Sequence, residues 1–140
     1  MSLRQASGEL RVATRGQRLY DITPQIAAWV AAQVMATGLL TLFVRHTTAS
    51  LIVQENADPD VLADLMDAYG RFAPQGAAYR HAAEGPDDMP GHIKAALSPV
   101  SLAIPVQHGR PALGTWQAIY LAEWRDAPHT RTVALHFIGE

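Results

Sequence analysis

The feature that most constrains the fold is a run of strand-like segments in the last third of the chain. Residues 100–106 alternate apolar and polar side chains, and residues 115–124 and 130–138 form two further strand-like segments with no helical pattern between them. Alternation with a period of two is typical of strands that bury one face. Strands that follow one another without helices favour antiparallel pairing. The sequence therefore predicts an α+β fold, a compact domain built on a largely antiparallel β-sheet.

Helical periodicity predicts two longer helices that pack on this sheet. Over residues 24–37, apolar side chains recur every four positions. We expect Thr23 to cap the start of this helix and Gly38 to end it, because both residue types favour those positions. A second helix is expected over residues 59–71, with Asp58 as its N-cap and an acidic, solvated face opposite its apolar stripe.

A loop rich in Gly, Pro and Ala over residues 73–87 separates the second helix from a short third helix over 89–97. Asp88 is the expected N-cap of this short helix. Residues 107–110 have the composition of a hairpin turn. Pro105 lacks an N–H donor, which predicts an edge strand or a bulge at that position. The remaining strands are expected at residues 9–14, 18–21, 39–45 and 49–54.

Composition limits the domain count and the classes of function. The chain has 140 residues, 49% of them hydrophobic, which suits one domain over residues 1–140. Its net charge of −2 argues against nucleic-acid binding, and no apolar run approaches the ~20 residues of a membrane span. The N-terminus lacks the apolar stretch of a signal peptide, so a cytoplasmic protein is expected. With no cysteine, any metal must bind His, Asp, Glu, backbone or water.

Ionisable residues are concentrated in residues 79–94, where two histidines, three acids and a lysine stand among glycines and prolines. Binding and catalytic groups tend to lie on loops that a rigid scaffold holds. This segment is therefore the first candidate for a functional site. Its candidate residues are His81, Glu84, Asp87, Asp88, His92 and Lys94.

Three histidines, His46, His81 and His92, lie in three different predicted elements. If they converge, they form a three-nitrogen site with open positions, the arrangement that a catalytic zinc uses. However, the sequence has no short metal-binding signature such as His-Glu-x-x-His. Spacing alone therefore favours structural roles, with His46 hydrogen-bonded at a strand end and His81 solvated in a loop.

Hydroxyl groups follow His46 directly, in Thr47, Thr48 and Ser50. Together with backbone donors they could bind an oxyanion or a phosphate, or they could form a turn with local side-chain to backbone bonds. A serine hydrolase is disfavoured, because the sequence has no Gly-x-Ser-x-Gly elbow.

Asn56 and the segment Gly114–Thr115–Trp116 are further candidates for ligand binding. Asn56 is not explained by helix capping. Trp116 stands beside a glycine at a strand start, where its ring either stacks on a substrate or packs in the core or an interface. Lys94 suits an anionic substrate, although an isolated lysine is more often solvated.

Four segments together resemble the YjbQ-like family, often labelled secondary thiamine-phosphate synthase. They are His46-Thr-Thr-Ala-Ser-Leu, Glu55-Asn-Ala-Asp-Pro-Asp, the segment from Tyr79 to Lys94, and Gly114-Thr-Trp-Gln-x-Ile-Tyr-Leu-x-Glu. The resemblance covers nearly the whole chain, and Asp-Asp-Met-Pro-x-His-Ile-Lys is its most specific block. The chain differs from the family pattern at Trp124 and in the turn over 126–130, which would alter the rim of the pocket.

The resemblance implies a compact α+β domain that assembles as a homotrimer. It also implies that His46, His81 and His92 converge near a subunit boundary and hold a divalent metal, zinc or magnesium. The implied reaction joins a pyrimidine diphosphate to a thiazole phosphate with loss of diphosphate, so a small phosphorylated metabolite is the expected partner.

Residue roles follow from the same resemblance. The expected catalytic residues are His46, Glu84, Asp87, Asp88 and Lys94, the acids orienting the histidines or holding Mg²⁺ and the lysine binding diphosphate. The expected substrate-binding residues are Thr47, Thr48, Ser50, Asn56, Gly114, Thr115 and Trp116. Two alternatives stay open: a metal-dependent hydrolase or other enzyme acting on a small phosphorylated metabolite, and a non-catalytic trimeric ligand-binding protein.

Overall fold

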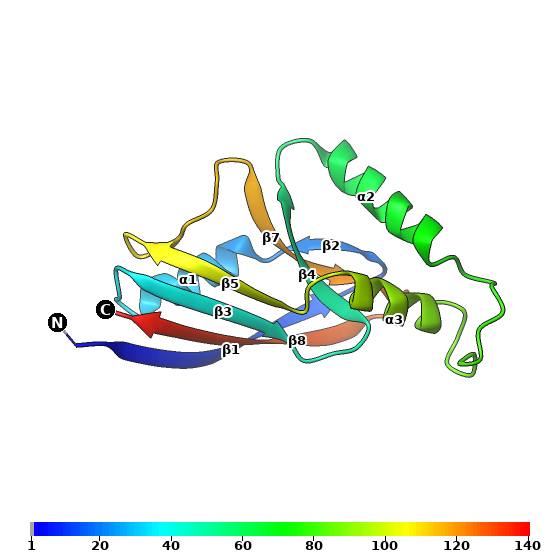
Figure 1. Cartoon of the computed structure of the whole chain (residues 1–140), viewed down its shortest axis with the longest axis horizontal. Helices are drawn as coiled ribbons and strands as arrows, with labels where there is room; N and C mark the ends of the chain where they lie inside the picture. Colours follow the sequence, from blue (N-terminus) through cyan, green and yellow to red (C-terminus); the bar gives the residue numbers. More distant parts are fainter. Residues whose placement is uncertain (1) are drawn as a thin grey trace.

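The computed structural model describes residues 2–140 as two antiparallel sheets with three helices (Figure 1). The elements in chain order are β1 (Arg4–Thr14), β2 (Arg18–Asp21), α1 (Thr23–Ala32), β3 (Gly38–Val44), β4 (Ala49–Glu55), α2 (Pro59–Phe72), α3 (Asp88–Leu97), β5 (Ser101–Gln107), β6 (Arg110–Pro111), β7 (Gln117–Glu123) and β8 (His129–Gly139). One sheet has the order β1-β8-β3-β5-β6 and the other β2-β7-β4, and every strand pair is antiparallel. The predicted α+β class is confirmed.

The central strand of the smaller sheet, β7, is buried on both faces. Ile119 and Leu121 belong to the main core, where side chains from both sheets and α1 meet. Ala118 and Tyr120 point to the opposite face and join a second apolar cluster, against which α2 side chains pack. Removing both faces of β7 from water accounts for the uninterrupted burial of its residues after the first.

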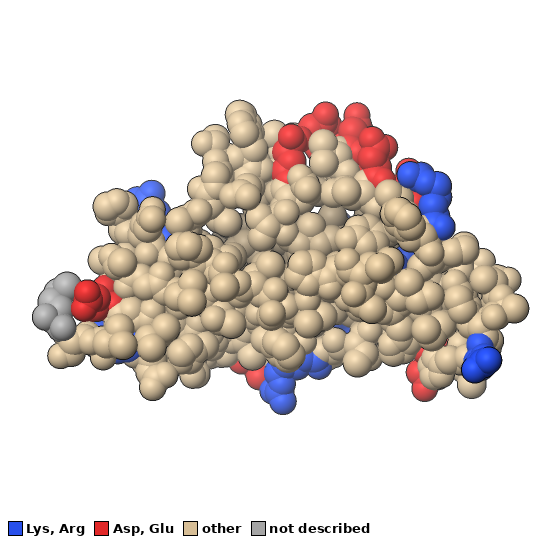
Figure 2. Space-filling model, viewed as in Figure 1, with Lys and Arg blue, Asp and Glu red and all other residues tan. Residues whose placement is uncertain are grey.

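Helix α2 is amphipathic, as the sequence predicts. Leu62, Met66 and Tyr69 lie against the second cluster, whereas Asp64 and Asp67 are exposed. Figure 2 shows acidic side chains gathered over this helix. Asp58 is its N-cap, because its carboxylate accepts a hydrogen bond of 2.9 Å from the backbone N–H of Asp60. That prediction is confirmed.

The expected helix over 24–37 is shorter in the structure and ends at Ala32. Backbone N–H groups of Ala36 and Thr37 donate to the carbonyl of Glu140, a contact with the far end of the chain that local periodicity does not reveal. Gly38 is therefore not a helix cap but the first residue of β3. Residues 2–140 thus contain one helix of 14 residues and two of 10, rather than two longer helices and one short one.

Thr23 is not the N-cap of α1, since Ile22 occupies that position. The Thr23 hydroxyl instead accepts a 2.8 Å hydrogen bond from the backbone N–H of Ile119 and so ties the helix start to β7. The carboxylate of Asp21 accepts from the Thr23 N–H at 2.9 Å and satisfies one free donor of the helix.

The predicted hairpin over 107–110 is confirmed between β5 and β6. His108 and Gly109 both have positive φ angles, 54° and 74°, as a type I′ turn requires. Outside β5 only the two-residue β6 pairs, so Pro105 lies in an almost uncovered edge strand, as its missing N–H predicts. Within residues 2–140, no helix is both long and apolar enough to cross a membrane.

Gly38 provides a test of the β3–β8 register. A Cβ at this position would meet the backbone carbonyl oxygen of Ile138 well inside van der Waals contact. We therefore expect Gly38→Ala to lower the free energy of unfolding by about 1–3 kcal/mol. Gly70→Ala is the matched control, because nothing lies within 4 Å of its added Cβ in α2. It should raise stability by about 0.5–1 kcal/mol.

Urea unfolding of the two variants and the parent protein measures both effects. Equal stability of Gly38→Ala and the parent would contradict the close approach of β3 and β8.

Candidate functional site

One arginine holds the segment before α3 against the rest of the molecule. The Nε of Arg125 donates to Oδ2 of Asp87 at 2.9 Å, and Nη1 donates to Oδ1 of Asp88 at 2.7 Å. Nη2 donates to the backbone carbonyl of Glu84 at 2.9 Å. The planar guanidinium thus fixes three points of residues 84–88 at once.

These contacts correct the prediction that Asp88 caps α3. Asp87 occupies the N-cap position, and its carboxylate bonds no helix N–H but Arg125 and the backbone N–H of Asp126, at 2.8 Å. Burial by itself raises the pKa of Asp87, but the hydrogen bonds from Asp126 and Arg125 outweigh it and lower the pKa. The hydrogen bond to Asp87 also raises the pKa of Arg125. Both partners are therefore charged at neutral pH.

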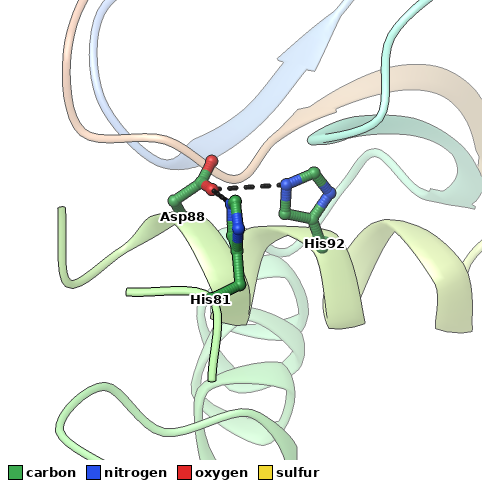
Figure 3. Close-up of side chains that lie close together, drawn as sticks. All are labelled: His81, Asp88 and His92. Atoms are coloured by element: carbon green, nitrogen blue, oxygen red, sulfur yellow. Dashed lines mark hydrogen bonds and ion pairs between the residues drawn. The ribbon is translucent and has the colours of Figure 1, made fainter. Parts of the chain in front are cut away.

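Asp88 is the first residue of α3 and carries the centre of the candidate site (Figure 3). Its Oδ2 lies 2.7 Å from Nε2 of His81 and 3.3 Å from Nε2 of His92. The carboxylate side chain is only 3% exposed, whereas His81 is 49% and His92 32% exposed. The cluster therefore consists of a buried carboxylate and two partly exposed imidazoles.

The three side chains offer a donor set for a cation. One nitrogen of each histidine and one oxygen of Asp88 all lie within 4.8 Å of one another. Two imidazole nitrogens and a carboxylate oxygen suit zinc and other transition-metal dications better than magnesium, which prefers oxygen ligands. In the structure, Nε2 of His81 lies within hydrogen-bond distance of Oδ2 of Asp88, so a metal at this nitrogen would replace that hydrogen bond and require the ring proton on Nδ1.

His46 lies outside this cluster in the single chain. Its Nε2 accepts a 2.8 Å hydrogen bond from the backbone N–H of Thr132, so that nitrogen carries no proton and is already engaged. Burial, and next the positive charge of Arg131, lower the pKa of His46. Its proton in the neutral state is therefore on Nδ1. The structure brings His81 and His92 together but does not add His46 to them as a third ligand.

Two hollows adjoin the cluster, one on the side of each histidine. A hollow of about 390 Å³ is lined by His92, His46 and Thr47, together with apolar residues such as Phe43. A second hollow, of about 340 Å³, is lined by His81 and apolar residues of the preceding loop. His46 and His92 thus share a cavity wall although they share no contact in the cluster.

Of the three predicted hydroxyl groups, only Thr47 is exposed to a hollow. The Thr48 hydroxyl accepts a 3.0 Å hydrogen bond from Arg131. Ser50 is fully buried and accepts from Trp124 Nε1 at 2.9 Å. It donates in turn to the Ser98 hydroxyl, 2.5 Å away, which itself donates to a backbone carbonyl. Thr48 and Ser50 therefore support the core and do not face a ligand.

Trp124 also belongs to the core. It is fully buried, and its ring centroid lies 4.9 Å from that of Tyr69 in α2. The departure from the family pattern at this position therefore changes packing under α2, not the rim of a pocket.

Lys94 and Glu84 lie away from the histidine cluster. Lys94 is 5% exposed, and its Nζ donates to Oε1 of Gln17 at 3.0 Å. It stands two positions after His92, so the helix turns it to a different face. Burial lowers the pKa of Lys94, against the opposing charges of Asp126 and Asp87. Glu84 is exposed and contributes its backbone carbonyl to Arg125.

The remaining predicted ligand-binding residues lie at the other end of the smaller sheet. The backbone N–H of Asn56 donates to the carbonyl of Trp116 at 2.9 Å, and Trp116 is 65% exposed. Gly114 and Thr115 are exposed in the same turn. The β4–β7 ladder extends over seven residues from there to Ala49, a span of about 20 Å at ~3.3 Å per residue. One chain therefore divides the predicted site into two groups.

Sequence reasoning missed a buried ion pair between Glu123 and Arg131, whose side chains are 0% and 4% exposed. Arg131 donates to both Glu123 oxygens, at 2.7 and 2.6 Å. Thr14 also donates to Glu123, at 2.6 Å. The pair thus joins β1, β7 and β8 beside Thr48. The sequence does carry a signal for this pair, because Glu123 and Arg131 are opposite charges on the apolar faces of two consecutive predicted strands, 115–124 and 130–138.

The fold and the cluster together define an antiparallel α+β protein with a candidate metal site at the start of α3. The chain belongs to the UPF0047 protein YjbQ-like family, whose model matches residues 8–140. UPF0047 protein sll1880 from Synechocystis sp. is 49% identical over 140 residues, with 99% of this chain and 95% of that protein covered. The predicted family membership is confirmed.

Solved structures agree with the fold. A YbjQ-like protein of unknown function from Sulfolobus solfataricus matches with a TM-score of 0.91 over 99% of this chain and 100% of that one; at 24% identity it supports the fold alone. The hypothetical protein APE1520 from Aeropyrum pernix matches with a TM-score of 0.87 at 32% identity, over 96% and 99% of the two chains. These relatives are named for a family or a source and not for an activity.

The buried ion pair predicts a pH-dependent loss of stability in Glu123→Gln. Burial raises the pKa of Glu123, but hydrogen bonds from Arg131 and Thr14 outweigh it and hold the pKa below its ordinary value of 4.5. A lowered folded-state pKa gives stability that is present above 4.5 and is lost as the pH falls through the folded-state value. At pH 7 we expect the free energy of unfolding of Glu123→Gln to be about 3–5 kcal/mol below that of the parent protein, because Arg131 is left buried without its partner.

Denaturant unfolding between pH 7 and pH 3 tests this. The difference in free energy of unfolding between Glu123→Gln and the parent protein should become smaller as the pH falls. Glu9→Gln is the control, because Glu9 forms an exposed pair with Arg11, and it should lower the free energy of unfolding by less than about 1 kcal/mol at every pH. A pH-independent difference would contradict the assigned role of Glu123.

The hydrogen bond to His46 predicts its tautomer. Above pH 6.5, long-range ¹H–¹⁵N correlation spectra should show the proton of His46 on Nδ1, and the ring should titrate below 6.5. His136 is the matched control, because its Nε2 donates to the Gln5 side chain at 2.8 Å and so carries the proton. An Nε2–H form of His46 would contradict the contact with Thr132.

Proposed function

We propose that His81, Asp88 and His92 bind a divalent metal ion and that the protein is an enzyme acting on a small phosphorylated metabolite at this centre. The supporting observation is the buried Asp88 oxygen between two half-exposed imidazole nitrogens. Of the two candidate ions, zinc and magnesium, the two nitrogen donors favour zinc.

The surroundings of Asp88 support this assignment. Arg125 binds the other carboxylate oxygen, Oδ1, and so orients Oδ2 toward the histidines. Partners that fix a metal-binding carboxylate are typical of metal sites and commonly contribute 10–100-fold to affinity. The exposure of both histidines leaves the open side that a catalytic site requires.

A small metabolite fits the hollow beside His92. Its volume of about 390 Å³ lies within the usual range of ligand sites, about 300–1,000 Å³. His46 and Thr47 line its wall, and each has a donor, the Nδ1–H of His46 and the hydroxyl of Thr47. Since Thr132 fixes the His46 ring, the Nδ1–H is a directed donor that suits a phosphate oxygen.

The specific reaction that we propose is thiamine-phosphate synthesis. The C–O bond between the pyrimidine methylene and diphosphate breaks, diphosphate leaves with the electron pair, and the thiazole nitrogen forms a new C–N bond to the methylene carbon. When bound, the metal would supply positive charge for the leaving diphosphate. His46 and Thr47 would donate hydrogen bonds to phosphate oxygens, and His81, Asp88 and His92 would hold the metal.

A homotrimer is part of this proposal. Asn56, Gly114, Thr115 and Trp116 lie across the β4–β7 ladder from the cluster in one chain. They can contribute to the same site only from a second copy. Exposure of the Trp116 ring, at 65%, is consistent with burial in such a contact.

Metal analysis of purified variants tests the centre. We expect about one zinc per chain in the parent protein and at least a tenfold loss of zinc affinity in His81→Ala and in His92→Ala, since each removes one ligand. His136→Ala, which removes a histidine hydrogen-bonded to Gln5 on another part of the molecule, should keep the metal. Equal metal content in all four proteins would contradict the site.

Turnover tests the reaction separately. The metal-loaded parent protein should form thiamine phosphate and diphosphate from the two substrates, and His92→Ala should not. Metal binding with tight binding of either substrate but no product would contradict an enzyme and favour a ligand-binding protein.

A further inference from the structure

A third hollow lies where the turn between β1 and β2 meets the start of β8. Its volume is about 570 Å³, and it shares no lining residue with the hollows beside His81 and His92. Arg15 and Arg18 line it from the turn side, and His129 and Thr130 line it from β8. It is therefore a separate feature from the metal cluster.

The two arginines of this hollow have no acidic partner among the described residues. Neither Arg15 nor Arg18 lies within ion-pair distance of a carboxylate among residues 2–140, and no Asp or Glu lines the cavity. The chain has 13 acidic and 11 basic residues, so an excess of cations does not explain the two unpaired arginines. Behind the hollow, Oε1 of the buried Glu123 lies 3.9 Å from Nδ1 of His129, and its carboxylate also accepts two hydrogen bonds from Arg131, which balance its charge.

Tyr20 orders both arginines. The Arg18 guanidinium lies 5.0 Å from the centroid of the Tyr20 ring, a cation–π contact. The Tyr20 hydroxyl accepts from the backbone N–H of Arg15 at 2.7 Å and donates to the carbonyl of Gly16 at 3.0 Å. Gly16 takes the positive φ, 84°, that this turn needs. Tyr20 therefore fixes the backbone at Arg15 and Gly16 and packs against the guanidinium of Arg18.

His129 adds a third group with a defined orientation. Its Nδ1 lies 2.7 Å from the carbonyl oxygen of Ala127, which can only accept, so Nδ1 donates. Nε2 is then the nitrogen left for a ligand; it accepts a hydrogen bond from a phosphate hydroxyl when the ring is neutral and donates to a phosphate oxygen when the ring is protonated. With the hydroxyl of Thr130 on the same wall, the hollow presents two guanidinium groups, an imidazole and a hydroxyl.

We propose that this hollow binds the phosphate group of a small phosphate monoester through Arg15, Arg18 and His129. Guanidinium groups bind phosphate oxygens in pairs, and two unpaired arginines around one cavity suit a dianion. The volume is in the range of small-molecule sites and far larger than inorganic phosphate needs. The site goes beyond the proposed function and requires no metal, since it uses none of the residues of the metal cluster.

Binding titrations in EDTA test the site while the metal centre is empty. The probes are ribose 5-phosphate, as a simple monoester, and inorganic phosphate, each followed by calorimetry and by ¹H–¹⁵N spectra. We expect saturable binding of ribose 5-phosphate, tighter than that of inorganic phosphate, with amide shifts centred on Thr14, Arg15, His129 and Thr130.

Arg15→Gln and Arg18→Gln should each weaken this binding at least tenfold, whereas Arg71→Gln, at the exposed end of α2, should leave it unchanged. The ¹H–¹⁵N spectra also establish that each variant is folded. No saturable binding, equal weakening in Arg71→Gln, or no weakening in the two hollow variants would overturn the proposal. Equal affinity for inorganic phosphate would overturn the monoester assignment.

Discussion

The contact of Arg125 with Asp87 and Asp88 is the interaction on which the candidate site depends. Helix α3 buries few large apolar side chains, and its buried residues include Asp88, Gly91 and Lys94. Apolar packing alone therefore does not fix its position. Buried carboxylates need partners that replace water, and Arg125 supplies them for Asp87 and for one oxygen of Asp88. The second oxygen of Asp88 is then free to face His81 and His92.

Three consecutive residues at the end of β7 connect the two sheets, the helices and the site. Glu123 forms the buried ion pair with Arg131, Trp124 packs against α2 and bonds Ser50, and Arg125 binds the loop before α3. Glu123 and Arg125 are further joined by a hydrogen bond of 3.1 Å from the Arg125 N–H. The candidate site is therefore attached to the ordered end of β7. Arg125 fixes the end of the 73–87 loop there through its contacts with Glu84 and Asp87.

Much of the fold could be predicted from the sequence, because strand alternation, the 107–110 turn and the Asp58 cap are local signals. The end of α1 could not be predicted, because periodicity continues to Val34 while the chain is redirected by bonds to Glu140. The concentration of ionisable residues over 79–94 predicted the segment that carries the candidate cluster of His81, Asp88 and His92. The roles within that segment could not be assigned, since the partner of Asp87 and Asp88 lies 38 and 37 positions away at Arg125. Likewise, Thr132 engages His46 across 86 positions.

A crystal structure of the zinc-loaded protein, with diffraction measured on both sides of the zinc absorption edge, tests whether His81, Asp88 and His92 bind the metal. We expect an anomalous peak within bonding distance of His81 Nε2, His92 Nε2 and Asp88 Oδ2, with Arg125 still bound to the other oxygen of Asp88. A peak at other residues, or none while His81 and His92 keep their contacts with Asp88, would contradict this assignment.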